Sequence, residues 1–138
     1  MTHARERAAR VAVLEDQPFF SQLLATILTS AGYDAVVLRE GPALLQAVAR
    51  RPPDLVVLDI DMPGMDGLEV LERLRRRYDR EALPIMMASA RGEHSYPLRA
   101  KALGADLFLK KPYSIAQLIE RVEALLSHSR AATAEVFL

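Results

Sequence analysis

The chain has 138 residues, enough for one domain with a substantial core, and its composition is typical of a globular protein, with 51% hydrophobic and 26% charged residues. Equal numbers of basic and acidic residues, 18 each, argue against broad nucleic-acid binding as the main activity. The absence of cysteine excludes disulfides and thiol catalysis, and with neither a membrane-length apolar run nor a signal peptide in the sequence we expect a cytoplasmic location.

The first half of the chain alternates short apolar runs with amphipathic segments. The runs have the length of buried strands and lie at Val11–Leu14, Ala35–Leu38 and Leu55–Leu58. Pro18 opens a predicted helix that ends at Gly32, and Pro42 opens a second that ends before Pro52. Apolar residues recur at helical spacing in the first of these helices: Phe19, Phe20, Leu23, Leu24, Ile27 and Leu28.

The second half continues the alternation. Two further strands are predicted at Ile85–Ala88 and Leu107–Leu109. Asp66 caps a third helix, in which Leu68, Leu71, Leu74 and Tyr78 should face inward and Arg73, Arg75 and Arg76 outward. A weaker fourth helix ends at Gly104; because proline is tolerated only in the first turn, Pro97 requires it to start near Ser95 or Tyr96. The capping-box pattern from Ser114 to Gln117 opens the fifth helix.

Five successive strand–helix units predict an α/β fold, a parallel sheet with helices on both faces. We expect one domain over residues 11–128, preceded by an extension at 1–10. Residues 129–138 should form a tail or the start of a linker.

Polar residues follow four of the predicted strands. Glu15 and Asp16 follow the first, Asp59 the third, Ser89 the fourth and Lys111 the fifth. The carboxyl ends of parallel strands meet at one edge, where binding sites form. Three carboxylates at this edge would repel one another, and a hard cation such as Mg²⁺ between them would relieve the repulsion. A nearby lysine adds a phosphate-binding group. The simpler alternatives are that Asp59 only caps a turn and that Glu15 and Asp16 favour a helix start.

These residues resemble the receiver domain of bacterial two-component response regulators, chemotaxis-type, over about Val11 to Ser127. The resemblance rests on five marks in one order: Glu15-Asp16, the strand with Asp59 followed by Met62-Pro63-Gly64-Met65-Asp66-Gly67, Ser89-Ala90, Gly104-Ala105-Asp106, and Lys111-Pro112. It implies a flavodoxin-like fold with strand order 2-1-3-4-5.

The resemblance also implies roles for individual residues. Asp59 would be the phosphoacceptor, taking a phosphoryl group from a sensor histidine kinase or phosphotransfer protein. Glu15, Asp16, Asp59 and the backbone carbonyl of Asp61 would hold Mg²⁺. Lys111, joined to proline by a cis peptide bond, would pair with the phosphoryl oxygens.

Ser89 and Phe108 match the switch hydroxyl and the switch aromatic of the family. The surface of the fourth helix, fifth strand and fifth helix would then change for a downstream effector domain or protein, or for a homodimer. Leu107 stands where winged-helix DNA-binding regulators often have a second acidic residue, so the dimer face that those regulators share is not well supported in this chain. We expect direct contact with neither nucleic acid nor membrane. The chain would not be an enzyme beyond Mg²⁺-dependent self-phosphorylation and slow autodephosphorylation.

Two other functions remain open on the sequence. A pseudo-receiver would use the same fold for phosphorylation-independent protein binding, but such modules usually lack one of the acidic, acceptor or lysine residues. The pattern from Asp59 to Asp61 also resembles the nucleophile motif of haloacid-dehalogenase-type phosphatases. Those enzymes place the motif on an early strand with the acidic pair downstream, whereas here the pair lies upstream.

Overall fold

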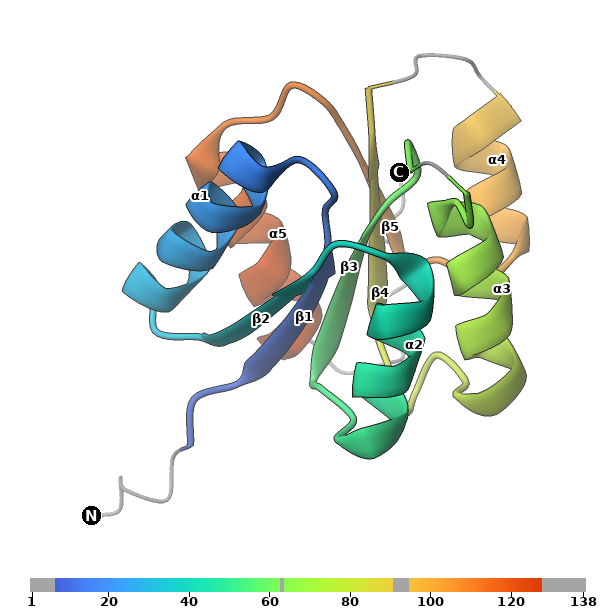
Figure 1. Cartoon of the computed structure of the whole chain (residues 1–138), viewed down its shortest axis with the longest axis horizontal. Helices are drawn as coiled ribbons and strands as arrows, with labels where there is room; N and C mark the ends of the chain where they lie inside the picture. The colour runs from blue at the N-terminus through green and yellow to red at the C-terminus, as the bar shows by residue number, and fades with distance from the viewer. Residues whose placement is uncertain (1–6, 63, 91–94, 128–138) are drawn as a thin grey trace.

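The computed structural model describes residues 7–62, 64–90 and 95–127, in which strands and helices alternate (Figure 1). The elements are β1 (Arg10–Leu14), α1 (Pro18–Ser30), β2 (Asp34–Leu38), α2 (Gly41–Arg50), β3 (Leu55–Asp59), α3 (Gly67–Arg77), β4 (Ile85–Ser89), α4 (Ser95–Ala102), β5 (Leu107–Lys110) and α5 (Ile115–Ser127). The predicted tail at 129–138 and residues 1–6 of the predicted extension lie outside the described residues.

The strands form one parallel sheet in the order β2-β1-β3-β4-β5, which confirms the predicted fold class. The register aligns the carboxyl ends of β3, β4 and β5, three of the four strands that carry the site. Asp59 of β3 pairs with Ala88 of β4, and Ser89 pairs with Lys110 of β5. The polar residues that follow the strands therefore meet at one edge of the sheet.

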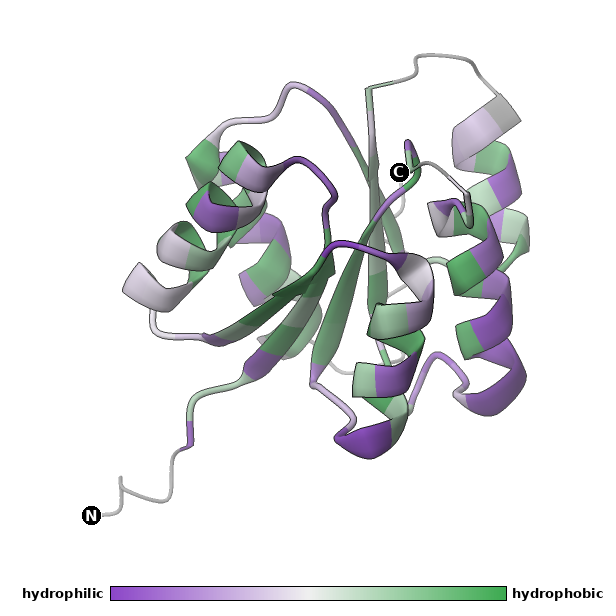
Figure 2. Ribbon diagram, in the orientation of Figure 1, coloured by the Kyte–Doolittle hydropathy of each residue, from purple (hydrophilic) through white to green (hydrophobic). Residues whose placement is uncertain are grey.

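Helices cover both faces of the sheet, with α1 and α5 on one face and α2, α3 and α4 on the other (Figure 1). Because side chains alternate between faces along a strand, each strand feeds both layers of the core. In β4, Met86 belongs to the same core cluster as Leu118 of α5, whereas Met87 belongs to the same cluster as Leu71 of α3. The central strands are accordingly hydrophobic along most of their length (Figure 2).

Local signals begin and end the helices as predicted. The Asp66 carboxylate accepts a hydrogen bond from the Glu69 N–H at the start of α3. Ser114 and Gln117 exchange the two hydrogen bonds of a capping box before α5. Helix α4 begins at Ser95, so that proline falls in its first turn. Among the described helices, none is long and apolar enough to cross a membrane.

Asp59 and Ser89 are the last residues of β3 and β4, as expected for polar residues at the strand ends. Helix α1 buries only part of its apolar surface. In α1 only Leu24 and Leu28 are buried, while Phe19 and Phe20 are 71% and 51% exposed.

The prediction that Arg75 faces solvent is wrong. Its side chain is 11% exposed and donates to the carbonyl oxygens of Leu83 (2.7 Å) and Gly104 (2.8 Å) and to the Asp106 carboxylate (3.0 Å). Asp106 is fully buried and also accepts from Arg80 at 2.7 Å. A buried carboxylate requires such partners, and the sequence pattern of α3 could not show it.

Candidate functional site

Two buried carboxylates and one lysine form the centre of the site. Asp59 ends β3, and Glu15 follows β1, the neighbouring strand; they are only 4% and 3% exposed. The Lys111 ammonium lies 3.1 Å from an Asp59 oxygen and 3.5 Å from a Glu15 oxygen. The Lys111 N–H donates to the Ser89 carbonyl at 2.8 Å, which fixes the start of the loop after β5 against β4. Three residues that are far apart in sequence therefore meet as predicted.

Asp16 completes an acidic cluster with these residues. One carboxylate oxygen each from Glu15, Asp16 and Asp59 lie within 4.8 Å of one another. Lys111 supplies one positive charge against these three carboxylates, so the cluster keeps a surplus of negative charge in a largely buried place. An oxygen-rich, negatively charged site of this kind fits a hard divalent cation such as Mg²⁺. The role of the Asp61 carbonyl in that site stays a prediction.

The pKa of Asp59 reflects this environment. Burial raises it from 3.8 to about 6, the Lys111 charge and the hydrogen bond from the Asp61 N–H oppose the rise, and the nearby Glu15 charge adds to it. For Lys111, burial lowers the pKa, but the charges of Asp59 and Glu15 outweigh burial and raise it overall. The lysine therefore stays protonated, and the ionised Asp59 is under-compensated until a cation joins it.

The loop after β3 is held close to Asp59 by a glycine. A Cβ atom on Gly67 would collide with the backbone carbonyl of Asp59. The Gly67 N–H donates instead to the Ile60 carbonyl at 3.4 Å, at the N-terminus of α3. The Pro/Gly-rich stretch of the sequence thus folds the start of α3 back against the end of β3. Pro63, which belongs to that stretch, lies outside the described residues.

Ser89 lies at the end of β4 and is fully buried. Its hydroxyl is 3.2 and 3.3 Å from the two carboxylate oxygens of Asp61, and the Ala90 N–H donates to the same carboxylate at 3.0 Å. The Asp61 N–H in turn donates to Asp59 at 3.0 Å. The side chain of Asp61 thus takes part in the site, whereas the predicted metal-ligand role concerns only its backbone carbonyl.

Phe108 lies on the opposite face of β5 from Leu107 and Leu109. It is half-buried and packs with the core on the side of α2, α3 and α4. It pairs in register with Met87, two residues before Ser89, so Ser89 and Phe108 share one face of the sheet. The structure therefore places both predicted switch residues toward α4, and their roles as switches stay predictions. The predicted cis bond between Lys111 and Pro112 is confirmed.

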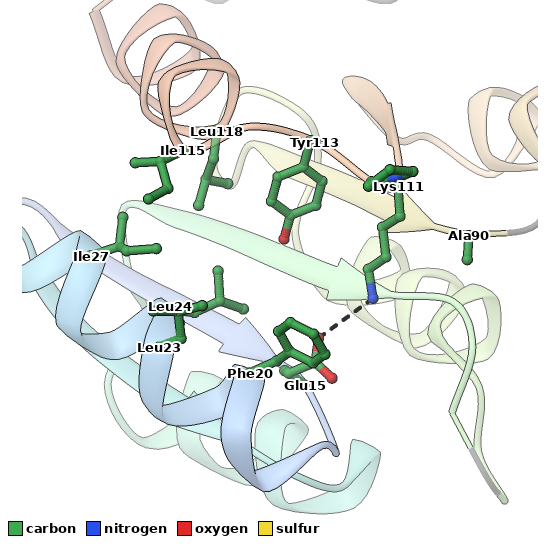
Figure 3. A pocket seen from close by; sticks show the side chains of 11 residues that line it. Glu15, Phe20, Leu23, Leu24, Ile27, Ala90, Lys111, Tyr113, Ile115 and Leu118 are labelled. Atoms are coloured by element: carbon green, nitrogen blue, oxygen red, sulfur yellow. Dashed lines mark hydrogen bonds and ion pairs between the residues drawn. The ribbon is translucent and has the colours of Figure 1, made fainter.

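An apolar groove of about 470 Å³ opens beside the acidic cluster (Figure 3). Phe20, Leu23 and Ile27 of α1 line one wall, and Ile115 and Leu118 of α5 line the other. Tyr113 also lines the groove, and Glu15 and Lys111 lie at its end. Sequence reasoning missed the groove, although the excess of apolar residues in the helix from Pro18 was the available signal.

The arrangement can hold a metal ion and an anionic phosphoryl group together. Asp59 offers a carboxylate oxygen as nucleophile, and Lys111 offers a fixed positive charge beside it. Ser89 adds a hydroxyl donor at the neighbouring strand. Phosphoryl transfer needs mainly positioning and charge neutralisation, both of which such a site can supply.

Comparison with protein families matches residues 11–123 to the response regulator receiver domain. Among curated relatives, the phosphate regulon transcriptional regulatory protein PhoB of Rhizobium meliloti is 39% identical over 88% of this chain and 53% of its own length. The transcriptional regulatory protein BaeR of Escherichia coli is 36% identical over 88% of this chain and 49% of its own. The chain thus spans about half the length of these relatives.

Solved structures show the same fold. The chemotaxis protein CheY4 of Vibrio cholerae matches with a TM-score of 0.81 and 25% identity, covering 86% of this chain and 99% of that one. The beryllofluoride-activated receiver domain of RstA from Klebsiella pneumoniae matches with a TM-score of 0.80 and 28% identity, covering 86% and 99%. The expected chemotaxis type is too narrow, because these sequence relatives are transcriptional regulators rather than chemotaxis proteins.

Proposed function

The chain belongs to the response regulator receiver domain family of two-component systems, and from this premise we propose that it is a signalling switch controlled by phosphorylation of Asp59. The observation that carries the proposal is the close approach of the buried Asp59 carboxylate to Lys111 (3.1 Å) inside an acidic cluster suited to a cation. Receiver domains are not classical enzymes, and self-phosphorylation with slow autodephosphorylation is the only chemistry we propose.

The reaction is a transfer between two side chains. A carboxylate oxygen of Asp59 attacks the phosphorus of a phosphohistidine, so that an O–P bond forms while the N–P bond breaks. The imidazole leaves with the bonding electrons and takes up a proton from solvent. Lys111 stabilises the negative charge on the phosphoryl oxygens, and the partial burial of the site limits hydrolysis. Glu15, Asp16, Asp59 and the Asp61 carbonyl would hold Mg²⁺, which would supply the remaining charge neutralisation.

The switch follows from the added charge. An aspartyl phosphate brings about −1.5 to −2 charges to the sheet edge, where Ser89 and Lys111 can bond to it. Ser89 and Phe108 share the face of the sheet covered by α4. We propose that their rearrangement changes the surface of α4, β5 and α5 for a downstream effector.

The phosphodonor is proposed to dock on the groove between α1 and α5. A donor must bring its phosphohistidine to Asp59, and the groove opens beside the two residues, Glu15 and Lys111, that contact or adjoin that carboxylate. Exposed Phe19, Phe20 and Leu23 extend the apolar surface along α1. A partner with an apolar helix next to its phosphohistidine fits this surface, as a sensor histidine kinase or phosphotransfer protein would.

The predictions on nucleic-acid contact and on the effector are affected by the length and type of the relatives. The comparisons do not support the prediction of no contact with nucleic acid, because the relatives are transcriptional regulators of about twice the length. A transcriptional output through a further domain is therefore the favoured form of the effector. Homodimerisation through α4, β5 and α5, the boundaries at 11–128 and the cytoplasmic location stay predictions.

The direct test is the intact mass after incubation with acetyl phosphate, with and without Mg²⁺. The wild type should gain one phosphoryl group only with Mg²⁺, and Asp59→Asn should gain none. Asp66→Asn is the matched control, because it removes a carboxylate from the same loop but leaves a good helix cap, and it should still be labelled.

The alternatives predict other results. No labelling of a folded wild type that also fails to bind beryllofluoride would indicate a pseudo-receiver. Continuous release of phosphate from p-nitrophenyl phosphate would favour the phosphatase alternative.

A further inference from the structure

The side chain of Asp61 joins two loops of the site. Its carboxylate accepts hydrogen bonds from the Ser89 hydroxyl (3.2 and 3.3 Å to the two oxygens) and from the Ala90 N–H (3.0 Å), both at the end of β4. Its own N–H donates to the Asp59 carboxylate at 3.0 Å. Asp61 therefore connects the phosphoacceptor strand to the residues that precede α4.

We propose that the Asp61 carboxylate is an internal competitor of the phosphoryl group. In the resting protein it occupies the Ser89 hydroxyl and the Ala90 N–H, a pair of donors that together bind an anion. This inference rests on the proposed function, which gives the Ser89 hydroxyl to a phosphoryl oxygen. On phosphorylation the Ser89 hydroxyl must then exchange its hydrogen bond to the Asp61 carboxylate for one to a phosphoryl oxygen.

Electrostatics favours that exchange once the phosphoryl group is attached. Asp61 is linked to Asp59 by a direct hydrogen bond, so the new negative charges arrive beside its carboxylate. Like charges that close repel, and the phosphoryl oxygens offer acceptors of at least equal strength. The carboxylate is then displaced, and the contact between the loop after β3 and the end of β4 is broken.

Two consequences follow. The resting contact lowers the affinity for an anion at Asp59, because each donor must first leave Asp61. It also holds Ser89 turned toward the site before phosphorylation, so the hydroxyl exchanges acceptors rather than travelling from the far side of β4. Asp61 is thus a positioning residue that sets the affinity of the site for a phosphoryl group at Asp59.

The first test needs no phosphorylation. Amide exchange at Ala90 should be faster in metal-free Asp61→Ala than in the wild type, because its N–H loses the acceptor. Asp61→Asn, which keeps an oxygen but not the charge, should give an intermediate rate and guards against misfolding of the alanine variant. Asp66→Asn, the matched charge change in the same loop, should leave the Ala90 rate unchanged. Unchanged exchange in both Asp61 variants would overturn the proposal.

The second test measures binding of beryllofluoride in the presence of Mg²⁺. Asp61→Ala should bind it about tenfold more tightly, since one hydrogen bond to a charged group is worth about that factor. In a Ser89→Ala background the gain from Asp61→Ala should shrink, because the two residues compete through the same hydroxyl.

An equal gain in Asp66→Asn, or an undiminished gain without the Ser89 hydroxyl, would show a general charge effect and overturn the competition. Faster Ala90 exchange without any beryllofluoride binding would instead overturn the proposed function while the resting contact stands.

Discussion

At the scale of single residues, the site combines groups that are unfavourable alone and compatible together. Asp59 and Glu15 are nearly buried carboxylates, and Lys111 compensates only part of their charge. The pKa of Asp59 is raised to about 6 because burial outweighs the lysine. Ionisation of Asp59 therefore destabilises the folded protein, and a bound cation would offset that loss of stability.

The raised pKa predicts how stability depends on pH. Between pH 3.8 and about 6 the folded protein keeps a proton on Asp59 that the unfolded chain has lost, so the free energy of unfolding falls as pH rises through this window. Metal-free Asp59→Asn avoids this loss and should be more stable than the wild type at pH 7.5 by about 1 to 2 kcal/mol, after allowance for screening.

Urea denaturation at pH 4 and pH 7.5 measures the effect. The difference between Asp59→Asn and the wild type should be small at the lower pH, and Mg²⁺ should reduce it at the higher one. A difference of equal size at both pH values would exclude ionisation of Asp59 as its cause.

At the scale of elements, Arg75 of α3 forms a buried ion pair with Asp106 that the sequence pattern of the helix did not predict. Arg75 joins α3 to the loop before β4 and to the residues before β5, through Leu83, Gly104 and Asp106. Asp106 also accepts from the Ile85 N–H at 2.8 Å, where β4 begins. The contact holds β4 and β5 in place from the end of the sheet opposite the site.

Arg75→Ala should lower the free energy of unfolding by about 3 kcal/mol, because it leaves the buried Asp106 carboxylate without its main counter-ion. Arg76→Ala is the matched control. Arg76 follows on the same helix but is 69% exposed, and its ion pair with Glu72 is 3.5 Å long, so its loss should cost less than about 0.5 kcal/mol. Equal losses for both arginines in urea denaturation would contradict this account of Asp106.

At the scale of the whole molecule, the two helical layers differ in how they cover the sheet. On one side α2, α3 and α4 bury a large core, whereas α1 and α5 leave Phe19, Phe20 and Ile115 exposed. This exposed surface borders the groove that opens beside the acidic cluster (Figure 3). Exposed apolar surface next to a reactive group is typical of a partner interface.

Phe20→Ser should slow phosphoryl transfer from a phosphorylated histidine kinase core by about tenfold, since an aromatic residue at an interface is a typical hot spot. Transfer from acetyl phosphate should not change. Leu98→Ser on α4 is the control, because Leu98 is also exposed (67%) but lies on the other layer. Radiolabel transfer with a kinase core selected for labelling the wild type measures both rates. A Phe20→Ser variant that is labelled as fast as the wild type by the kinase would overturn the docking proposal.

Most of the fold could be predicted from the sequence because its signals are local. Apolar runs of strand length, prolines at helix starts, glycines at helix ends and two capping patterns place each element within a few residues. The strict alternation of strand and helix then leaves few topologies for a parallel sheet. The resemblance to receiver domains added the strand order, which periodicity alone does not contain.

The residues of the site were predictable for a related reason: Asp59, Ser89 and Lys111 each stand where an apolar run ends, and parallel strands bring such ends to one edge. What only the tertiary structure decided is which side chain meets which. The buried role of Arg75, the contact of the Asp61 carboxylate with Ser89, and the groove beside α1 all depend on distances between segments remote in sequence. The packing of the whole core sets those distances, and the local hydrophobic pattern of the sequence does not predict them.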